Sequence, residues 1–325
     1  PPIMDIAKDR GGPPKPGQTY HDNILGNLGD GPIAWRFGSD DPANNVDVTG
    51  DGIGDLNAEP RSVDALAYGA RPLPDGNSTA NIKASIEWDL ANIPGISPAD
   101  LDLGRLAHIA GEINLVSGGV ITTYATIQEA INASVDGDTV TIGAGTYVQT
   151  GVLNVNKEIS IIGAGDGATI IETGVAGYGL HVTADNVSLS DMSIDASNTT
   201  HYGVKIDPGS GVYEDAITNF SMEDMTVSGA GRSEIDMNGL DGGTFTNVTA
   251  DGLDTSGVGF GVSDSTGITF TDITTTGNNW GAVGLYSAGR SYEPGTDDVT
   301  FAGTFTSDDA PGIYMEEELL EGVPT

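Results

Sequence analysis

The stretch from Tyr124 to Ile171 reads YATIQEAINASVDGDTVTIGAGTYVQTGVLNVNKEISIIGAGDGATII, and it decides the fold. It opens with a short segment, Ala125–Ser134, in which Ile127, Ala130 and Ile131 share one helical face. A Gly-Asp turn follows, and the remainder is a series of short β-branched segments separated by glycines. This order predicts one short helix followed by many short strands.

Similar segments recur along the rest of the chain. They are NVSLSDMSI from Asn186, NFSMEDMTV from Asn219, GTFTNVTA from Gly243, GITFTDITT from Gly267 and DVTFAGTFT from Asp298. One position of these blocks holds Asp191, Asp224, Asn247, Asp272 and, in the last block, Gly303. The separations fit a base period of about 24 residues with two insertions, which is typical of stacked coils. We expect the recurring Asp or Asn to close turns through side-chain hydrogen bonds to the backbone.

A second series of short apolar segments lies between these blocks. It comprises Gly179–Val182, Gly203–Ile206, Glu234–Met237, Gly259–Val262, Val283–Tyr286 and Gly312–Met315. Alternate residues of a strand point to opposite faces, so the stacked Val, Ile, Leu, Phe and Met residues would form one continuous core. The sequence therefore predicts a second sheet in the same stack.

The order of elements resembles the opening turns of a right-handed parallel β-helix of the pectin-lyase-like superfamily. Gly137–Val140 and Gly145–Tyr147 also resemble the segment with which pectin methylesterases begin. The resemblance implies an all-β fold, with a right-handed parallel β-helix over residues 119–325 and an N-terminal capping helix. Lyases, esterases, epimerases, phage tailspikes and inert surface proteins share this architecture, so the resemblance leaves the function open.

The first 118 residues are of another type. Residues 1–30 are rich in Pro and Gly and predict an extended arm, and residues 31–118 predict a small mainly-β domain. Alternating apolar residues indicate strands at Ala34–Phe37 and Ile82–Trp88, and Leu106–Leu115 reads as another strand. Residues 86–103, IEWDLANIPGISPADLDL, faintly resemble carbohydrate-binding sandwich modules. The chain begins with Pro-Pro, which we interpret as a processed chain or a fragment of a longer secreted protein.

The composition is strongly acidic, with 12 Lys and Arg against 47 Asp and Glu and a formal net charge of -35. Such a charge repels nucleic acid and anionic lipid headgroups, which excludes nucleic-acid partners, and we expect no membrane insertion. It also concentrates cations such as Ca²⁺. The chain has no Cys, so metal ions rather than disulfides are expected to stabilise it. Together these features predict an extracellular or cell-surface location.

The segment Asp47–Asp55, DVTGDGIGD, is the sharpest local motif. It resembles the first nine positions of an EF-hand loop and the short calcium loops of dockerins and thrombospondin type 3 repeats. The position of the EF-hand glutamate holds Ala58, which departs from that pattern. The resemblance implies a structural Ca²⁺ ion, with a plain Asp/Gly turn as the alternative. The implied ligands are Asp47, Thr49, Asp51, the Ile53 carbonyl and Asp55.

Chemistry on a uronate needs a group that neutralises the carboxylate and a base that removes a proton. Within the predicted β-helix, His181 and Lys205 occupy matching strands of successive coils, and His201 lies nearby in sequence. These three residues are weak catalytic candidates, and the alternative is that they are exposed side chains on a solvated sheet. Trp280 is predicted either to stack on sugar rings from a coil turn or to pack in the core.

Three functions of different classes remain open. The first is an acidic, calcium-stabilised extracellular structural or adhesive protein: a sheath, filament or surface-layer component that self-associates through the β-helix ends. The second is a polysaccharide lyase or epimerase acting on an anionic glycan, and the third is a carbohydrate-binding module of a larger secreted protein. The small number of cations in the β-helix favours the first over the second.

Overall fold

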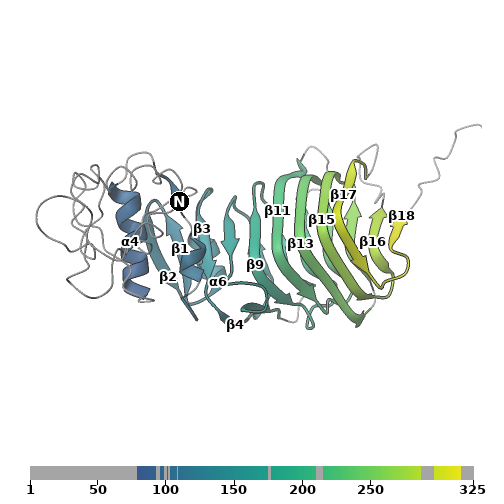
Figure 1. The fold of residues 1–325 in the computed structure, drawn as a ribbon, viewed down its shortest axis with the longest axis horizontal. Coiled ribbons are helices and arrows are strands. Elements are labelled where there is room, and N and C mark those ends of the chain that lie inside the picture. Colours follow the sequence, from purple (N-terminus) through teal and green to yellow (C-terminus); the bar gives the residue numbers. More distant parts are fainter. Residues whose placement is uncertain are drawn as a thin grey trace, which may run out of the picture. The chain divides into compact units, whose positions relative to one another are not determined.

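The computed structural model describes residues 79–92, 96–98, 101, 103–107, 109–174, 177–209, 215–255, 257–286 and 296–315. The chain divides into two compact units, residues 1–105 with 119–121, and residues 106–118 with 122–325. In the second unit, successive strands stack into a parallel β-helix (Figure 1), which confirms the predicted fold class. Among the described residues, no helix is both long and apolar enough to span a membrane.

One sheet, called sheet B here, has seven strands in the order β18-β16-β14-β12-β10-β8-β5. Its strands are β5 (Leu153–Val155), β8 (Tyr178–Val182), β10 (Tyr202–Ile206), β12 (Ser233–Asn238), β14 (Val258–Ser263), β16 (Gly281–Tyr286) and β18 (Ile313–Met315). All neighbours in this sheet are parallel. Each segment of the second sequence series therefore forms a strand of sheet B, as predicted.

The other sheet, sheet A, has eleven strands, with the main order β17-β15-β13-β11-β9-β6-β3-β1-β2. Its strands are β1 (Ile113–Ser117), β2 (Val120–Tyr124), β3 (Thr139–Ile142), β4 (Gly145–Val148), β6 (Ser160–Ile162), β7 (Thr169–Glu172), β9 (Ser188–Asp195), β11 (Ile217–Ser228), β13 (Leu240–Thr255), β15 (Thr266–Asn278) and β17 (Val299–Ser307). Strand β9 pairs with β6 through its first half and with β7 through its second half. From β9 onward, each coil thus contributes one long strand to sheet A in place of two short strands.

The recurring Asp or Asn residue marks the bend in each long strand of sheet A. Its backbone is left-handed in every coil, and the residues and φ angles are Asp191 (59°), Asp224 (52°), Asn247 (51°), Asp272 (52°) and Gly303 (64°). Asp, Asn and Gly tolerate this conformation best. These residues have a structural role, but it differs from the predicted closure of turns, because their bonds join neighbouring coils. The amide of Asn247 donates to Oδ1 of Asp224 at 2.5 Å, and the backbone N–H of Thr304 donates to Oδ1 of Asp272 at 2.8 Å.

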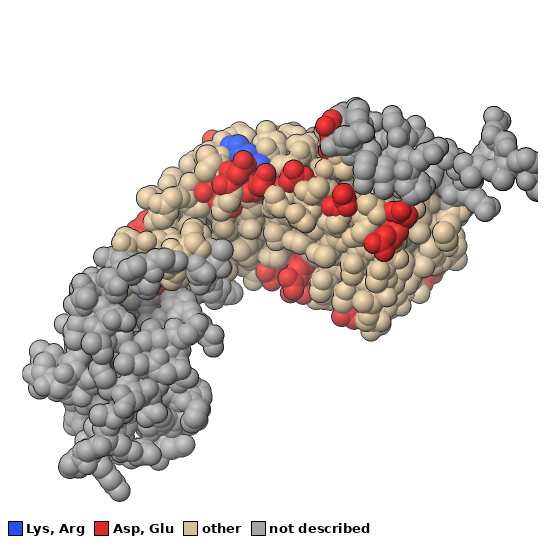
Figure 2. Space-filling view, turned by 90° about the horizontal axis from the view of Figure 1, so that it is seen from above, with Lys and Arg blue, Asp and Glu red and all other residues tan. Residues whose placement is uncertain are grey.

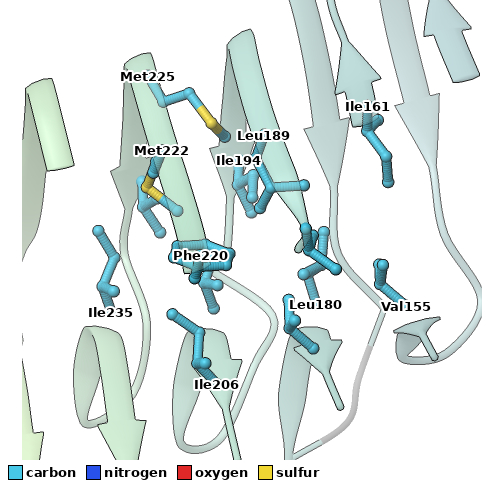
Figure 3. Packing of buried hydrophobic residues seen from close by; sticks show 14 of the residues in the cluster. Val155, Ile161, Leu180, Leu189, Ile194, Ile206, Phe220, Met222, Met225 and Ile235 are labelled. Atoms are coloured by element: carbon cyan, nitrogen blue, oxygen red, sulfur yellow. The ribbon is translucent and has the colours of Figure 1, made fainter. Parts of the chain in front are cut away.

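The core fills the space between the sheets with inward-pointing apolar side chains (Figure 3). Its largest members are phenylalanines on successive strands: the ring centroids of Phe245 and Phe270 are 5.2 Å apart, and those of Phe260 and Phe270 are 5.1 Å apart. Such offset and edge-on aromatic pairs add to the burial of their apolar surface. The predicted continuous core is confirmed.

Helix α6 (Ile127–Ala133) lies where the sequence placed its first helix, with Ile127, Ala130 and Ile131 buried. A capping box between Thr126 and Glu129 fixes its start. The side chain of Gln128 pairs with the backbone of Asn154 in β5, accepting from N–H at 2.8 Å and donating to the carbonyl at 3.2 Å. The helix therefore covers the first edge of sheet B and prevents pairing there.

Two strand predictions were wrong. Ile82–Trp88 lies within helix α4 (Thr79–Asn92), because its apolar residues also fit a helical period, and Ile86 and Asp89 share a buried face. Leu106–Leu115 divides between the end of helix α5 (Gly104–Ala107) and the start of β1. The predicted strand at Ala34–Phe37 lies outside the described residues, as does the 1–30 arm.

Candidate functional site

The outer face of sheet B has one row of residues with an unusual composition. Strand pairing places Lys205, Asp236, Gly261, Gly284 and Tyr314 side by side on β10, β12, β14, β16 and β18. The neighbouring residues in each strand point inward, so this row faces outward. The two consecutive glycines leave the middle of the row without side chains of its own, and the ring of Tyr286 lies over one of them, Gly284.

A groove of about 660 Å³ runs over this part of sheet B. Its described lining residues are Tyr202, Arg232, Ser233, Asp236, Asn238, Ser263, Trp280, Tyr286, Pro311 and Tyr314. Trp280 precedes β16 and is 52% exposed, and Tyr314 in β18 is 42% exposed. Four of the ten lining residues are thus aromatic, and the two most exposed rings stand at one end.

Three of the four aromatic side chains of the groove, those of Tyr202, Tyr286 and Tyr314, pack against another aromatic ring. The rings of Tyr286 and Tyr314 lie 5.8 Å apart at 46°. At the other end, Tyr202 stacks on Tyr178 with ring centroids 5.7 Å apart and planes at 25°. Rings fixed in this way lose little conformational freedom when a ligand binds.

A buried ion pair lies at the Tyr202 end of the groove. Nζ of Lys205 bonds Oδ2 of Asp236 and lies 3.7 Å from Oδ2 of Asp207. Burial raises the pKa of Asp236, and the Lys205 charge opposes this shift. Burial, with a smaller contribution from the Asp236 charge, raises the pKa of Tyr202 to about 12. Tyr202 is therefore a neutral hydrogen-bonding group at neutral pH.

Arg232 contributes a second positive charge beside this pair. Its guanidinium carbon lies 5.6 Å from the centroid of the Tyr202 ring, and its side chain is exposed. Its backbone N–H donates to the carbonyl of His201 at 2.7 Å. The next coil passes close by, because a Cβ on Gly257 would overlap the carbonyl of Arg232. The backbone under the guanidinium is thus firmly held.

The catalytic candidates from the sequence lie near the groove but are not among its described lining residues. His181 pairs with Lys205 across β8 and β10, and Lys205 is 3% exposed beneath Asp236. Desolvation lowers the pKa of His181, against the opposing charge of Asp207. His201 is exposed, with its ring centroid 6.0 Å from that of Tyr202. The structure therefore brings His181 and Lys205 together but does not point them at the groove.

The predicted calcium ligands, Asp47, Thr49, Asp51, Ile53 and Asp55, lie outside the described residues. In the part of the chain that the structure describes, no group of three or more His, Cys, Asp or Glu side chains could hold a metal ion. The calcium loop remains a prediction.

Sequence reasoning named Trp280 but missed Asp236, Asn238, Tyr286 and Tyr314. The available signal was the second series of segments: when their inward residues are aligned, the outward positions show two glycines flanked by polar and aromatic residues. What the alignment could not show is which of these positions share a hollow.

No protein-family model matches the sequence, and no curated protein matches it. Among solved structures, the chain is similar to ORF18 of Geobacillus virus E2, with 17% identity over 60% of this chain and 48% of that chain, and a TM-score of 0.42. It is similar to the N-terminal fragment of bacteriophage Phi29 gene product 12, with 13% identity, 58% and 39% coverage and a TM-score of 0.41. It is also similar to the A-module of the Azotobacter vinelandii mannuronan C-5 epimerase AlgE4, with 15% identity, 58% and 70% coverage and a TM-score of 0.34. The alignments thus span less than half of each phage chain, and likenesses at this level carry no argument about function.

Proposed function

We propose that this protein binds a carbohydrate chain in the groove on the outer face of sheet B. The observation that carries the proposal is the grouping of Trp280, Tyr286 and Tyr314 in one groove, on a face where the row of outward residues includes two glycines. Aromatic rings with one exposed face offer a flat apolar surface with polar edges, which suits the faces of sugar rings. Ser233, Asn238 and Ser263 add hydroxyl and amide groups for hydrogen bonds to sugar hydroxyls.

The groove suits an extended chain rather than a single sugar. It draws residues from β10, β12, β14, β16 and β18, five neighbouring strands of sheet B. Strands lie about 4.8 Å apart, so four steps give a length of roughly 19 Å. A bound chain would run along the stack, across the strands, and would contact several coils at once.

Binding without cleavage is the simpler activity for these residues. Hydrolysis of a glycosidic bond generally uses two carboxyl groups flanking the bond. Among the described lining residues, Asp236 is the only carboxyl group, and it is paired with Lys205. A lyase or epimerase, with Lys205 and His181 as weak candidates, remains the alternative.

The proposal is compatible with an adhesive surface protein. The acidic composition favours an extracellular or cell-surface location. The proposal also includes a structural Ca²⁺ ion at Asp47–Asp55. It further includes self-association through the β-helix ends and membership of the pectin-lyase-like superfamily. A surface protein that holds a polysaccharide would join the adhesive and carbohydrate-binding hypotheses.

Affinity electrophoresis of the full chain in gels containing neutral or acidic polysaccharides tests the proposal. We expect retardation by at least one polysaccharide, and its loss in Trp280→Ala and Tyr314→Ala. Val148→Ala is the matched control, because Val148 is a 69% exposed apolar residue on sheet A. Absence of retardation by every polysaccharide, or equal retardation of Trp280→Ala and the wild type, would rule the proposal out.

The same polysaccharides, incubated with the protein in Ca²⁺ or in chelator, separate binding from turnover. Growth of ultraviolet absorbance from unsaturated uronates would identify a lyase instead. A flat trace with retained binding supports the proposal.

A further inference from the structure

The placement of basic residues says more about the ligand. Residues 119–325 contain four Lys or Arg, and three of them, Lys157, Lys205 and Arg232, are described. Two of these three lie at the groove or directly beneath it. On the face drawn in Figure 2, acidic side chains are spread widely while the basic ones form one small patch. Positive charge is therefore scarce in residues 119–325, and two of the three described basic residues lie at this groove.

Two of the three described cations are already neutralised or bonded within the protein. Nζ of Lys157 donates to the carbonyls of Asn132 and Ser134 at 2.6 and 2.5 Å, at the end of α6. Nζ of Lys205 is paired with Asp236 and lies near Asp207. Both lysines thus have structural partners.

Arg232 differs from both lysines. No described carboxylate lies within ion-pair distance of its guanidinium, although its charge is near enough to act on Asp236. Its side chain is exposed at the groove and its planar group lies over Tyr202. An arginine stacked on an aromatic ring keeps its fork of N–H donors available for a planar or tetrahedral anion. The groove also holds an acceptor, because Oδ1 of Asn238 is buried without a hydrogen-bond partner among the described residues.

We propose that the chain bound in the groove carries an acidic group, a carboxylate or a sulfate ester, and that Arg232 receives it. This inference rests on the proposed function. It adds a direction to the groove: the acidic unit lies beside Arg232 and Tyr202, and uncharged sugar faces lie on Trp280 and Tyr314. The large negative charge of the rest of the surface disfavours a chain with closely spaced acidic groups, so the fit is best for a polysaccharide in which acidic units alternate with neutral ones.

The test measures dissociation constants for matched pairs of polysaccharide oligomers. One pair is a uronate-containing oligomer and its carboxyl-reduced form, and the other is a sulfated oligomer and its desulfated form. We expect one acidic member to bind about 10- to 100-fold more tightly than its neutral counterpart, the range for a charge-assisted hydrogen bond. The pair that shows this difference in affinity identifies the acidic group as a carboxylate or a sulfate ester. Added salt should reduce the preference, because the guanidinium is exposed.

Three variants connect the preference to Arg232. Arg232→Gln should bind the acidic and neutral members equally, with the neutral member bound as by the wild type. Arg232→Lys should keep part of the preference, since it retains the charge without the planar fork. Lys157→Gln removes one positive charge away from the groove and should keep the full preference. Thermal unfolding of each variant confirms that it is folded.

The outcomes separate this inference from the proposed function. Equal binding of both members of each pair by the wild type, or an unchanged preference in Arg232→Gln, overturns the inference while leaving carbohydrate binding intact. Loss of all binding in Trp280→Ala together with loss of the preference alone in Arg232→Gln supports both.

Discussion

A Cβ atom on Gly284 would lie 2.5 Å from Cζ of Tyr286, two residues along β16. The tyrosine ring therefore leans back over the glycine on the outer face of sheet B and forms part of the groove. Gly284 is not among the glycines with positive φ. Glycine is required here because a side chain would overlap the Tyr286 ring, not because of the backbone conformation, and the position of that ring in the groove depends on Gly284.

Gly284→Ala should displace the Tyr286 ring and weaken carbohydrate binding several-fold. The ring is partly exposed and can move, so the free energy of unfolding should fall by about 1 kcal/mol, the low end for an added methyl group. Isothermal titration and urea unfolding measure the two effects. Gly151→Ala is the control, since nothing lies within 4 Å of its Cβ position. Unchanged binding in Gly284→Ala would show that the ring position is unimportant.

The Lys205–Asp236 pair predicts a non-additive effect on stability. Lys205 is 3% exposed and Asp236 9% exposed, so removing one partner leaves a buried charge. Lys205→Met alone should lower the free energy of unfolding by about 3–5 kcal/mol, whereas Lys205→Met with Asp236→Leu should recover much of that loss. Guanidinium unfolding of the two single variants and the double variant tests this. Additive losses would mean that the two residues act independently.

Glu234 predicts a pH dependence of stability. It is 1% exposed, both carboxyl oxygens accept from the N–H of Ala230 at 3.1 Å, and burial raises its pKa from 4.5 to about 8. The folded state thus holds the proton more tightly than the unfolded state. The contribution to stability is complete below pH 4.5 and is lost as the pH rises through about 8, by on the order of 5 kcal/mol.

Glu234→Gln keeps an acceptor for Ala230 and removes the ionisation. Its free energy of unfolding should change less than that of the wild type between pH 4.5 and 8, and it should exceed the wild-type value above pH 8. Glu234→Ala, which also loses the hydrogen bond, should be less stable than Glu234→Gln at every pH. Denaturant unfolding at several pH values across this range tests the prediction. If the free energies of unfolding of the wild type and Glu234→Gln changed in parallel with pH, the prediction would be contradicted.

The left-handed backbone at Asn247 predicts that glycine is tolerated better than valine at this position, the reverse of their usual order in strands. Asn247→Gly should be tolerated, because glycine adopts a φ of 51° without strain, although the bond to Asp224 is lost. Asn247→Val should lower the free energy of unfolding by about 1–2 kcal/mol more, despite the usual preference of valine for strands. Thermal unfolding of the two variants measures the difference, and equal stability would argue against backbone strain at this bend.

The repeat pattern predicted the β-helix correctly, because inward positions recur with the strand period in every coil. The prediction failed where the pattern was short and isolated. In Ile82–Trp88, apolar and polar residues alternate over only seven residues, and no similar segment recurs elsewhere in the chain. Either a helix or a strand would bury some of its apolar residues. The bend residues were also predictable, since Asp, Asn and Gly are the types that accept a left-handed backbone.

The candidate site was only partly predictable. Trp280 was recognised as a residue that could contact sugars, and His181 and Lys205 as neighbours on one face. Asp236 and Tyr314 are 78 residues apart in sequence numbering, and nothing local in either segment indicates that they share a groove. Their proximity arises from the loop lengths between coils, which set the register of each strand against the next.

By itself, the sequence determined the stacked coils, the apolar core and the bends, because each depends on residue type at a periodic position. The tertiary structure alone decided which outward residues line one groove, and which described cation is exposed there without a described carboxylate partner. The physical reason is that burial and backbone conformation constrain every coil alike, whereas a groove depends on side chains contributed once each by different coils.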